Sequence, residues 1–336
     1  YTLIAYFGTE ETVTLPASIN GSKYMIHEMK GVRNVIISEG VDRIGYFAFY
    51  SCDSLTSVVI AGSVTSIGEY AFGYCTNLKS VVISSNVKTW GFNVFSNCSS
   101  LERLVISGGT ERVGLDAFES CRELTNVEIA DGVAIIEGGA FRDCVKLASI
   151  TIPDSVTNIE SSAFSNCSNL SEIVLPQKKL FLGAGVFDGT AFFNNADNWQ
   201  NGELYIGRHL IALDNDAVFF EQNSQIIDIA NGAFDNCSKL ISVAGSGSMI
   251  SSVRVSNLET FVFTDSPTKC IYRYFGWNIG ALPITLKTIV LSKGCEVKQA
   301  GLFVGITGAT IYVEANKEDC PWDEDLPGWN NGNKVY

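Results

Sequence analysis

Hydrophobic and polar positions in the stretch Val32–Phe187 follow a pattern that returns every 23 residues. In one copy, Leu55 is followed by Val58 and Ile60, and this alternation predicts a short strand with these side chains in the core. A turn, a second apolar pair, a bend at Gly68 and an Ala-Phe pair complete the copy. Each repeat therefore predicts two short strands joined by turns.

The period predicts how these strands assemble. Repeats of about 20–29 residues built on an L-x-x-V-x-I core are typical of leucine-rich repeats, in which each copy forms one coil of a solenoid. One coil cannot bury its own apolar face, so equivalent residues of successive coils stack into columns. We expect a β-rich solenoid whose short strands stack into a parallel sheet, with few or short helices.

One column consists of phenylalanine, which lies three residues before a cysteine in each repeat. Its members are Phe49, Phe72, Phe95, Phe118, Phe141, Phe164 and Phe187. Stacked rings add about 0.5–1.5 kcal/mol per pair beyond their burial. We therefore interpret these rings as core residues and not as an aromatic binding box.

A second column consists of cysteine. Its members are Cys52, Cys75, Cys98, Cys121, Cys144, Cys167 and, after an interruption, Cys237. Equivalent Cβ atoms on adjacent coils point the same way, which is unfavourable for a disulfide torsion. We expect buried free thiols, because redox or metal chemistry has no CxxC motif or neighbouring histidine in its favour. The pairing of Cys270, Cys295 and Cys320, outside the column, stays open.

The recurrent form L-x-x-V-x-I-p-x-x-V-t-x-I-g-x-x-A-F-x-x-C resembles the BspA-like leucine-rich repeats. Clear copies are Leu55–Cys75, Leu78–Cys98, Leu124–Cys144 and Leu147–Cys167. Trp90 departs from the pattern, where isoleucine is expected, and Glu137 and Glu160 replace the glycine of the bend. The resemblance implies a secreted or cell-surface protein, often of a host-associated microbe, whose repeats mediate adhesion. It brings no shared catalytic residues, and fold-level analogy does not identify a ligand.

Breaks in the period divide the chain. A strand is expected at Thr12–Leu15 and a turn at 20–22, so the N-terminal segment resembles a cap. Weaker repeats are expected around 258–263 and 286–291, and a last strand at Thr310–Val313. The expected segments are an N-terminal cap (1–31), seven regular leucine-rich repeats (32–190), a hairpin insertion (191–222), degenerate repeats (223–313) and a C-terminal cap or tail (314–336).

Composition narrows the class of partner. The net charge of −13 disfavours nucleic acid and anionic membrane surfaces as partners. No apolar run approaches the length of about 20 residues that spans a bilayer, so we expect no membrane insertion within this segment. The chain begins at Tyr1 and has no charged-then-apolar leader, so we expect a processed or trimmed form whose signal peptide lies outside this segment.

Candidate chemistry is sparse. The sequence contains no GxSxG, HExxH or P-loop motif, and His27 and His209 each stand alone. We therefore expect no catalytic residues, no cofactor and no metal. The acidic pairs Asp214/Asp216 and Asp323/Asp325 lack the spacing of a dedicated calcium loop, so solvated turns are favoured while calcium stays open.

The residue between the two inward positions of each first strand points outward. This column contains Ile36, Val59, Val82, Val105, Glu128, Thr151 and Val174, and the column beside it contains Asn34, Ser57, Ser80, Arg103, Asn126, Ser149 and Glu172. Branched residues favour strands wherever they sit, and this alone can explain the apolar column. The functional interpretation is an apolar stripe on a concave ligand-binding face, with Arg103 and Glu172 as specificity contacts.

Two functions compete on this evidence. One is a non-catalytic adhesion or binding protein with an extracellular protein or glycan ligand, and the other is a structural spacer that displays further modules at the cell surface. An enzyme is disfavoured by the missing motifs. Binding to glycans or matrix proteins separates the first from the second.

Overall fold

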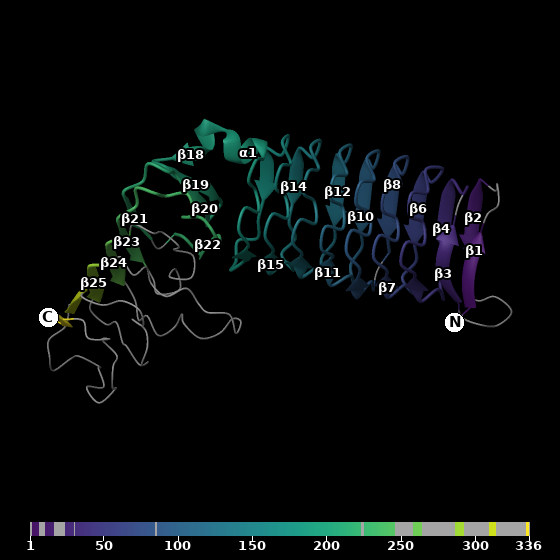
Figure 1. Ribbon diagram of the computed structural model, residues 1–336, viewed down its shortest axis with the longest axis horizontal. Helices are drawn as coiled ribbons and strands as arrows, with labels where there is room; N and C mark the ends of the chain where they lie inside the picture. The colour runs from purple at the N-terminus through teal and green to yellow at the C-terminus, as the bar shows by residue number, and fades with distance from the viewer. Residues whose placement is uncertain are drawn as a thin grey trace, which may run out of the picture. The chain divides into compact units, whose positions relative to one another are not determined.

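The computed structural model describes residues 2–6, 11–16, 24–29, 31–84, 86–222, 225–245, 258–263, 286–291, 309–313 and 334–335. The chain forms two compact units, Tyr1–Asn198 and Trp199–Tyr336 (Figure 1). The predicted turn at 20–22, the tail at 314–333 and the three outlying cysteines lie outside the described residues.

The first strands of the repeats in the first unit form a row of parallel strands. Six of them make one sheet in the order β12-β10-β8-β6-β4-β2. Their bounds are β2 Thr12–Leu15, β4 Asn34–Ile37, β6 Ser57–Ile60, β8 Ser80–Ile83, β10 Arg103–Ile106 and β12 Asn126–Ile129. A separate pair follows, β14 Ser149–Thr151 and β16 Glu172–Val174. The strands that the period predicts are thus present, and the fold is a leucine-rich-repeat solenoid.

A second row consists of further parallel strands, which are two residues long from β5 onward. One sheet has the order β1-β3-β5-β7-β9 and another the order β11-β13-β15-β17. The bounds are β1 Thr2–Tyr6, β3 Tyr24–Met29, β5 Arg43–Ile44, β7 Ser66–Ile67, β9 Thr89–Trp90, β11 Arg112–Val113, β13 Ile135–Ile136, β15 Asn158–Ile159 and β17 Phe181–Leu182. The row divides after β9, at Trp90, which departs from the repeat pattern. The Trp90 side chain occupies the space that a Cβ atom on Gly114 would need.

The core of the first unit lies between these rows. The leucine, valine, isoleucine and alanine positions of the repeat are buried, as the pattern predicts. The seven phenylalanine rings form a buried ladder in which neighbouring centroids are 4.7 to 5.8 Å apart and neighbouring rings are nearly parallel. The rings are therefore core residues, as predicted, and each coil supports the next.

The turn that follows each second strand returns the chain to the cysteine column. Two residues in this turn adopt a left-handed backbone conformation. One position is held by Phe47, Tyr70, Asn93, Asp116, Gly139, Ser162 and Gly185, and the other by Ser51, Tyr74, Asn97, Ser120, Asp143, Asn166 and Gly189. Glycine, asparagine and aspartate tolerate this conformation, whereas a bulky side chain in it is an outlier. The first two turns therefore carry a strain that the later turns avoid.

The first unit ends in its only described helices, both short. The helix α1 Ala191–Asn194 begins after Thr190, whose Oγ1 accepts a hydrogen bond from the amide of Phe193 at 3.1 Å. The 3-10 helix η1 Ala196–Asn198 follows directly. Helices are thus few and short, as expected for this fold.

The second unit begins with an antiparallel hairpin, as the alternating sequence predicts. It contains β18 Trp199–Gln200, β19 Glu203–Ile206 and β20 His209–Leu213. The β19–β20 turn is at Gly207 and Arg208, so His209 lies inside a strand. The strand β22 Asp228–Ile229 pairs in parallel with β20 and resumes the coil pattern.

A parallel sheet of six strands completes the second unit, in the order β21-β23-β24-β25-β26-β27. Their bounds are β21 Phe219–Glu221, β23 Ser242–Gly245, β24 Thr260–Phe263, β25 Thr288–Leu291, β26 Thr310–Val313 and β27 Lys334–Val335. The strand predicted at Thr310–Val313 is present as β26, but the prediction that it is the last strand is wrong. The two residues of β27 pair with it, and a strand that short has no periodicity to reveal it.

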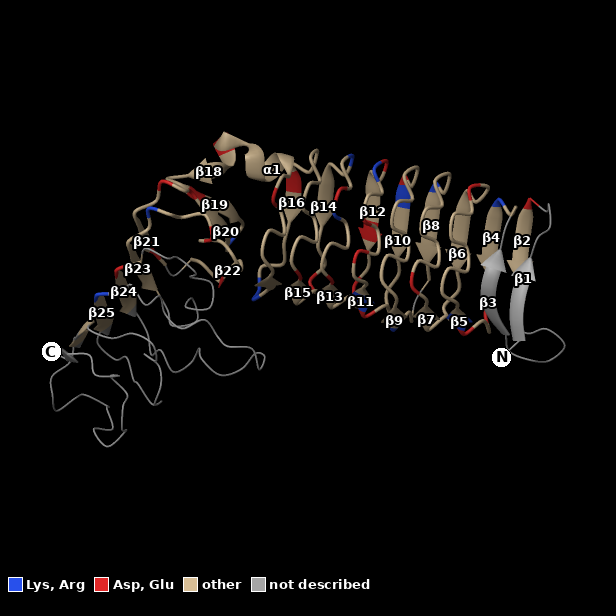
Figure 2. Cartoon of the chain, in the orientation of Figure 1, with Lys and Arg blue, Asp and Glu red and all other residues tan. Residues whose placement is uncertain are grey.

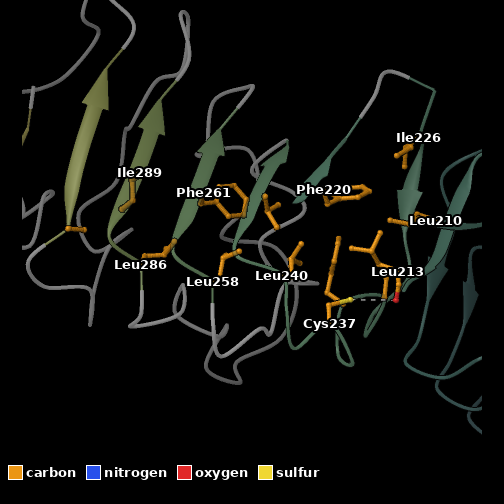
Figure 3. Close-up of a cluster of buried hydrophobic side chains, with 14 residues drawn as sticks. Leu210, Leu213, Phe220, Ile226, Cys237, Leu240, Leu258, Phe261, Leu286 and Ile289 are labelled. Carbon is orange, nitrogen blue, oxygen red and sulfur yellow. Dashed lines mark hydrogen bonds between the residues drawn. The ribbon is translucent and has the colours of Figure 1, made fainter. Parts of the chain in front are cut away.

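The core of this unit continues the same residue types. Figure 3 shows buried side chains arranged along successive strands, among them Phe220, Leu240, Leu258, Phe261 and Ile289. The Sγ atom of Cys237 lies 3.5 Å from the carbonyl oxygen of Leu213. The cysteine position therefore has the same buried role here as in the regular repeats.

Candidate ligand-binding face

The candidate face is the outer side of the first-strand row, and strand register places its residues in columns. The register pairs Ile36 with Val59, Val59 with Val82, Val82 with Val105 and Val105 with Glu128. The same pairings align Asn34, Ser57, Ser80, Arg103 and Asn126 in the second column. Because successive side chains of a strand alternate between faces, both columns lie opposite the buried core positions.

Exposure differs along the apolar column. Ile36 is 40% exposed and Val59 38%, while Val82 and Val105 are partly buried between their neighbours. Val174 is 56% exposed. Such side chains retain apolar surface that a partner can bury.

The columns are not continuous over all seven repeats. Thr151 and Val174, with Ser149 and Glu172 beside them, lie on the separate pair β14–β16. The six-stranded sheet ends at β12, where Val127 and Ile129 are also less buried than their counterparts in earlier strands. The structure thus brings six predicted site residues together on one sheet and places Thr151, Glu172 and Val174 on another; the six are Ile36, Val59, Val82, Arg103, Val105 and Glu128.

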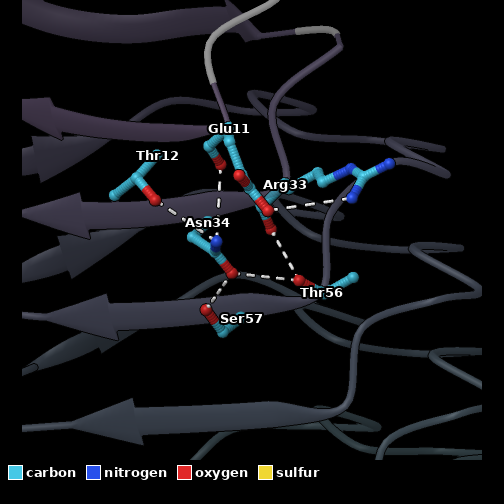
Figure 4. A network of polar contacts seen from close by, with 6 residues as sticks. All are labelled: Glu11, Thr12, Arg33, Asn34, Thr56 and Ser57. Carbon is cyan, nitrogen blue, oxygen red and sulfur yellow. Dashed lines mark hydrogen bonds and ion pairs between the residues drawn. The ribbon is translucent and has the colours of Figure 1, made fainter.

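Polar side chains fix the strand ends at the N-terminal side of this face. The Nδ2 atom of Asn34 donates to the backbone oxygen of Glu11 at 3.4 Å and to Thr12 Oγ1 at 3.3 Å. Its Oδ1 atom accepts from Thr56 Oγ1 at 3.0 Å and from Ser57 Oγ at 2.7 Å (Figure 4). Asn34 therefore connects three adjacent coils and holds β2 in register with β4.

Charged side chains occur on this face only on β10 and the strands that follow it. The strands β4, β6 and β8 contain no Lys, Arg, Asp or Glu, whereas β10, β12 and β16 each carry one (Figure 2). The guanidinium of Arg103 pairs with the carboxylate of Glu128 at 2.9 Å, and both side chains are more than half exposed. The predicted specificity contact Arg103 is therefore partnered within the protein, by a residue of the neighbouring column.

The cysteine column shows no sign of reactivity. Its seven thiols are free and buried, and the Sγ atoms of Cys98 and Cys121 lie 3.2 and 3.3 Å from backbone oxygens of phenylalanine in the preceding coil. Burial raises the pKa of Cys121 far above the ordinary value of 9.0, and only the thiolate is a good nucleophile or metal ligand. These observations agree with the structural role that the sequence predicts.

Other candidate sites are weaker. Asp214 Oδ1 accepts a hydrogen bond from the amide of Asp216 at 3.2 Å, and Asp216 pairs with the Lys239 ammonium, which supports a solvated acidic turn. Asp323 and Asp325 lie outside the described residues. Within the described ranges, no three His, Cys, Asp or Glu side chains are placed to hold a metal ion.

Sequence reasoning missed two features. One is a shallow hollow beside the hairpin, where Tyr205 and Glu203 share a hydrogen bond and Arg208 lines the wall. The other is a set of exposed aromatic residues on the first three turns, including Tyr46, Phe47 and Phe92. The ring of Phe47 could have been recognised from the sequence, because later repeats fill its position with Asn, Asp, Ser or Gly.

Comparisons with known proteins place these observations in context. The family model for the BspA type leucine-rich repeat region matches residues 10–123 and 91–201, in six copies, which together span more than half of the chain. A leucine-rich repeat protein of T. pallidum is 32% identical, with 58% of this chain and 83% of that chain covered and a TM-score of 0.48.

Two further solved structures are similar at lower identity. A leucine-rich repeat protein from Bacteroides ovatus is 22% identical over 97% of this chain and 92% of that chain, with a TM-score of 0.49. A leucine-rich cell surface protein from Faecalibacterium prausnitzii is 23% identical over 99% and 89%, with a TM-score of 0.45. No curated protein sequence matches the chain. None of the helices in the described ranges is long and apolar enough to cross a membrane.

Proposed function

Since the chain belongs to the family of BspA-type leucine-rich repeat proteins, we propose that it is a non-catalytic binding protein of the cell surface or the secreted space. Proteins with this type of repeat are typically surface proteins that take part in protein interactions. The ligand is an extracellular protein or glycan, of a host or of another cell, and it lies across the outer side of the first-strand row.

The observation that carries this proposal is the uncharged part of the face. On three successive strands, β4, β6 and β8, apolar side chains lie beside Asn34, Ser57 and Ser80 without any charge between them. A partner that covers this area buries apolar surface and desolvates no ion, and both effects favour association. The Arg103–Glu128 pair stands at the edge of this area, where charges affect specificity more than affinity.

The remaining residues of the proposed face extend it toward the C-terminal side of the first unit. Thr151, Glu172 and Val174 contribute contacts from β14 and β16 to a ligand long enough to pass the end of the six-stranded sheet. Glu172 would add a second charged contact beside the exposed Val174. Short ligands would bind to the N-terminal part alone.

The test places a charge in the apolar column. We expect Val82→Asp with Val105→Asp to reduce binding to an array of matrix proteins and glycans, and adhesion to cells, at least tenfold, because the ligand would have to bury two carboxylates. Val82→Thr and Val105→Thr keep the branched shape and should retain most of the binding. Thr89→Asp, on the second strand row, adds one carboxylate elsewhere and is the matched control for the single variants Val82→Asp and Val105→Asp.

Circular dichroism and thermal unfolding confirm that each variant is folded before binding is compared. Equal binding by the wild type and the folded double aspartate variant would remove this face from the proposal. If the wild type binds no member of the array and no cell, the alternative function is favoured, in which the rigid stack is a spacer that displays other modules.

A further inference from the structure

Six aromatic residues cluster on the turns that follow β5, β7 and β9, away from the buried ring ladder. We call them the aromatic cluster: Tyr46, Phe47, Tyr50, Tyr70, Tyr74 and Phe92. Five of them are between 39% and 65% exposed, and Tyr70 is partly buried. Exposed aromatic groups of this size on adjacent turns mark a surface that can bind a partner.

Four rings of the cluster contact one another. The Phe47 ring stacks on Tyr70 with centroids 5.6 Å apart and meets Tyr50 edge-on at 5.4 Å. Tyr50 in turn lies 6.0 Å from Tyr70 and 5.5 Å from Tyr74. These four of the six rings therefore form a connected surface across two coils.

Three residues of the cluster have an unfavourable backbone conformation. Phe47, Tyr70 and Tyr74 have φ angles of 56°, 51° and 61°, in the left-handed region where bulky side chains are outliers. The third turn has Asn93 and Asn97 at the same two positions, and asparagine tolerates this conformation. Strained residues of this kind gather at functional sites.

Gly73 makes room for the cluster. It occupies the position of Tyr50 one coil later, and a Cβ atom there would lie 2.8 Å from Cδ1 of Tyr70 and 3.5 Å from Cδ2 of Tyr50. Later turns carry Ser96, Glu119, Arg142, Ser165 and Asp188 at this position. The absence of a side chain at Gly73 therefore fits the neighbouring rings.

The charged residues within the first two turns of the cluster are acidic. Between Arg43 and Lys79 the sequence contains no Lys, Arg or His, but it contains Asp53 and Glu69. Partial burial, followed by the influence of Tyr74 and Glu69, raises the pKa of Tyr70. The faces of aromatic rings also attract cations, and more strongly where water is excluded.

From the connected rings, the strained backbone and the acidic surroundings, we infer that the aromatic cluster binds a positively charged segment of another protein through its Arg or Lys side chains. The site is separate from the sheet face of the proposed function, because its residues lie on the turns after the second strands. A cationic side chain placed over Phe47, Tyr50 or Tyr74 would meet ring faces, with Glu69 supplying charge nearby.

The test uses the full chain and a fluorescent peptide with alternating arginine and glycine. A second peptide has citrulline in place of each arginine, which keeps the shape and removes the charge. We expect fluorescence anisotropy to show that the wild type binds the arginine peptide at least tenfold more tightly than the citrulline peptide, with an affinity that falls as salt rises.

The decisive variant is Phe47→Asn, Tyr70→Asn and Tyr74→Asn combined. It leaves the net charge unchanged and gives each position the residue that the third turn already has, so the fold should be retained or stabilised. We expect binding of the arginine peptide to weaken at least tenfold. Ser120→Asn with Ser162→Asn makes comparable changes in turns outside the cluster and should bind as the wild type does.

Two further variants separate rings from charge. Glu69→Gln should weaken binding several-fold with the rings in place, and Gly73→Ala should weaken it by displacing the Tyr70 ring. The inference is overturned if the triple asparagine variant binds the arginine peptide like the wild type, or if both peptides bind equally. Tight binding of a neutral oligosaccharide such as cellohexaose, without binding of the arginine peptide, would overturn it as well. The sheet-face proposal is tested by the Val82 and Val105 variants instead. Failure of that proposal can therefore be distinguished from failure of the aromatic-cluster inference.

Discussion

The buried ring ladder and the exposed aromatic cluster use the same kind of side chain in opposite ways. The ladder holds one phenylalanine per coil in seven successive coils, each fully buried and nearly parallel to the next. The cluster holds six rings on only three turns, and three of these rings are attached to a left-handed backbone. One set follows the period and the other departs from it.

This difference separates what the fold requires from what it merely permits. A residue that recurs in every coil has the same neighbours each time, so packing alone explains its identity. An aromatic residue that appears in one or two turns, and is replaced by Asn, Asp, Ser or Gly in the others, is not needed for stacking. Departures from the repeat, and especially strained ones, are therefore the places to search for function in this molecule.

The largest expected effect comes from the ladder. Phe118 has ring neighbours on both sides, Phe95 at 5.2 Å and Phe141 at 5.5 Å. Phe118→Ala should lower the free energy of unfolding by about 3–5 kcal/mol, because it removes both contacts and leaves a cavity. Urea unfolding followed by circular dichroism measures this. Tyr46→Ala, in the cluster, should change stability by only about 0.5 kcal/mol or less, and an equal loss in both variants would contradict the comparison.

The second largest effect on stability is expected from the pH dependence of the buried thiols. Burial raises the pKa of Cys121 above its ordinary value of 9.0, so the folded protein keeps the thiol protonated at a pH where the unfolded chain ionises. The stabilisation is complete below about pH 9 and is lost as the pH rises further, by about 1.4 kcal/mol per pH unit for one thiol. The free energy of unfolding should therefore fall more steeply between about pH 9 and 10 in the wild type than in Cys121→Ala. Parallel slopes would show that the thiol ionises in the folded state.

Substitution in the aromatic cluster is expected to raise the free energy of unfolding slightly instead of lowering it. Tyr74→Asn removes a bulky side chain from the left-handed region, so the free energy of unfolding should stay unchanged or rise by up to about 1 kcal/mol. The reverse substitution Asn97→Tyr, at the same position one coil later, should lower it by about 1 kcal/mol. Thermal and urea unfolding of the two variants measure both changes. A clear loss of stability in Tyr74→Asn would mean that the cluster serves packing.

The smallest effect is expected for the charge pair on the sheet face. Arg103 and Glu128 are both well exposed, and such pairs contribute about 0.2–1 kcal/mol. A double-mutant cycle with Arg103→Met and Glu128→Gln should give a coupling energy in this range that decreases with added salt. A coupling that salt does not change would show that the pair is less solvated than its exposure indicates.

Much of the fold could be predicted because the period repeats each inward position. Leu55, Val58, Ile60 and Phe72 have the environment of their counterparts one coil away, so a single copy determines the others. The strand β27 and the division of the second row at Trp90 could not be predicted in the same way. They depend on two-residue pairings and on one bulky side chain, and neither leaves a periodic signal.

The candidate sites show the same limit. Alternation identified the outward residues from Ile36 to Val174, because side-chain direction in a strand follows from position. It did not reveal that Arg103 pairs with Glu128 across strands or that β14 starts a new sheet. The aromatic cluster was missed because the backbone angles of Phe47, Tyr70 and Tyr74 are properties of the turn, which the residue names do not disclose.

The free thiols have a consequence for where such a scaffold can fold. Each cysteine from Cys75 to Cys167 directs its sulfur at a carbonyl oxygen of the coil before it, at 2.9 to 3.3 Å, and needs no covalent partner to fill its site. The regular coils can therefore reach the same native arrangement in a reducing cytosol and in an oxidising exterior. A chain of this design depends on neither an oxidant nor an isomerase to build its repeats, whatever compartment it passes through.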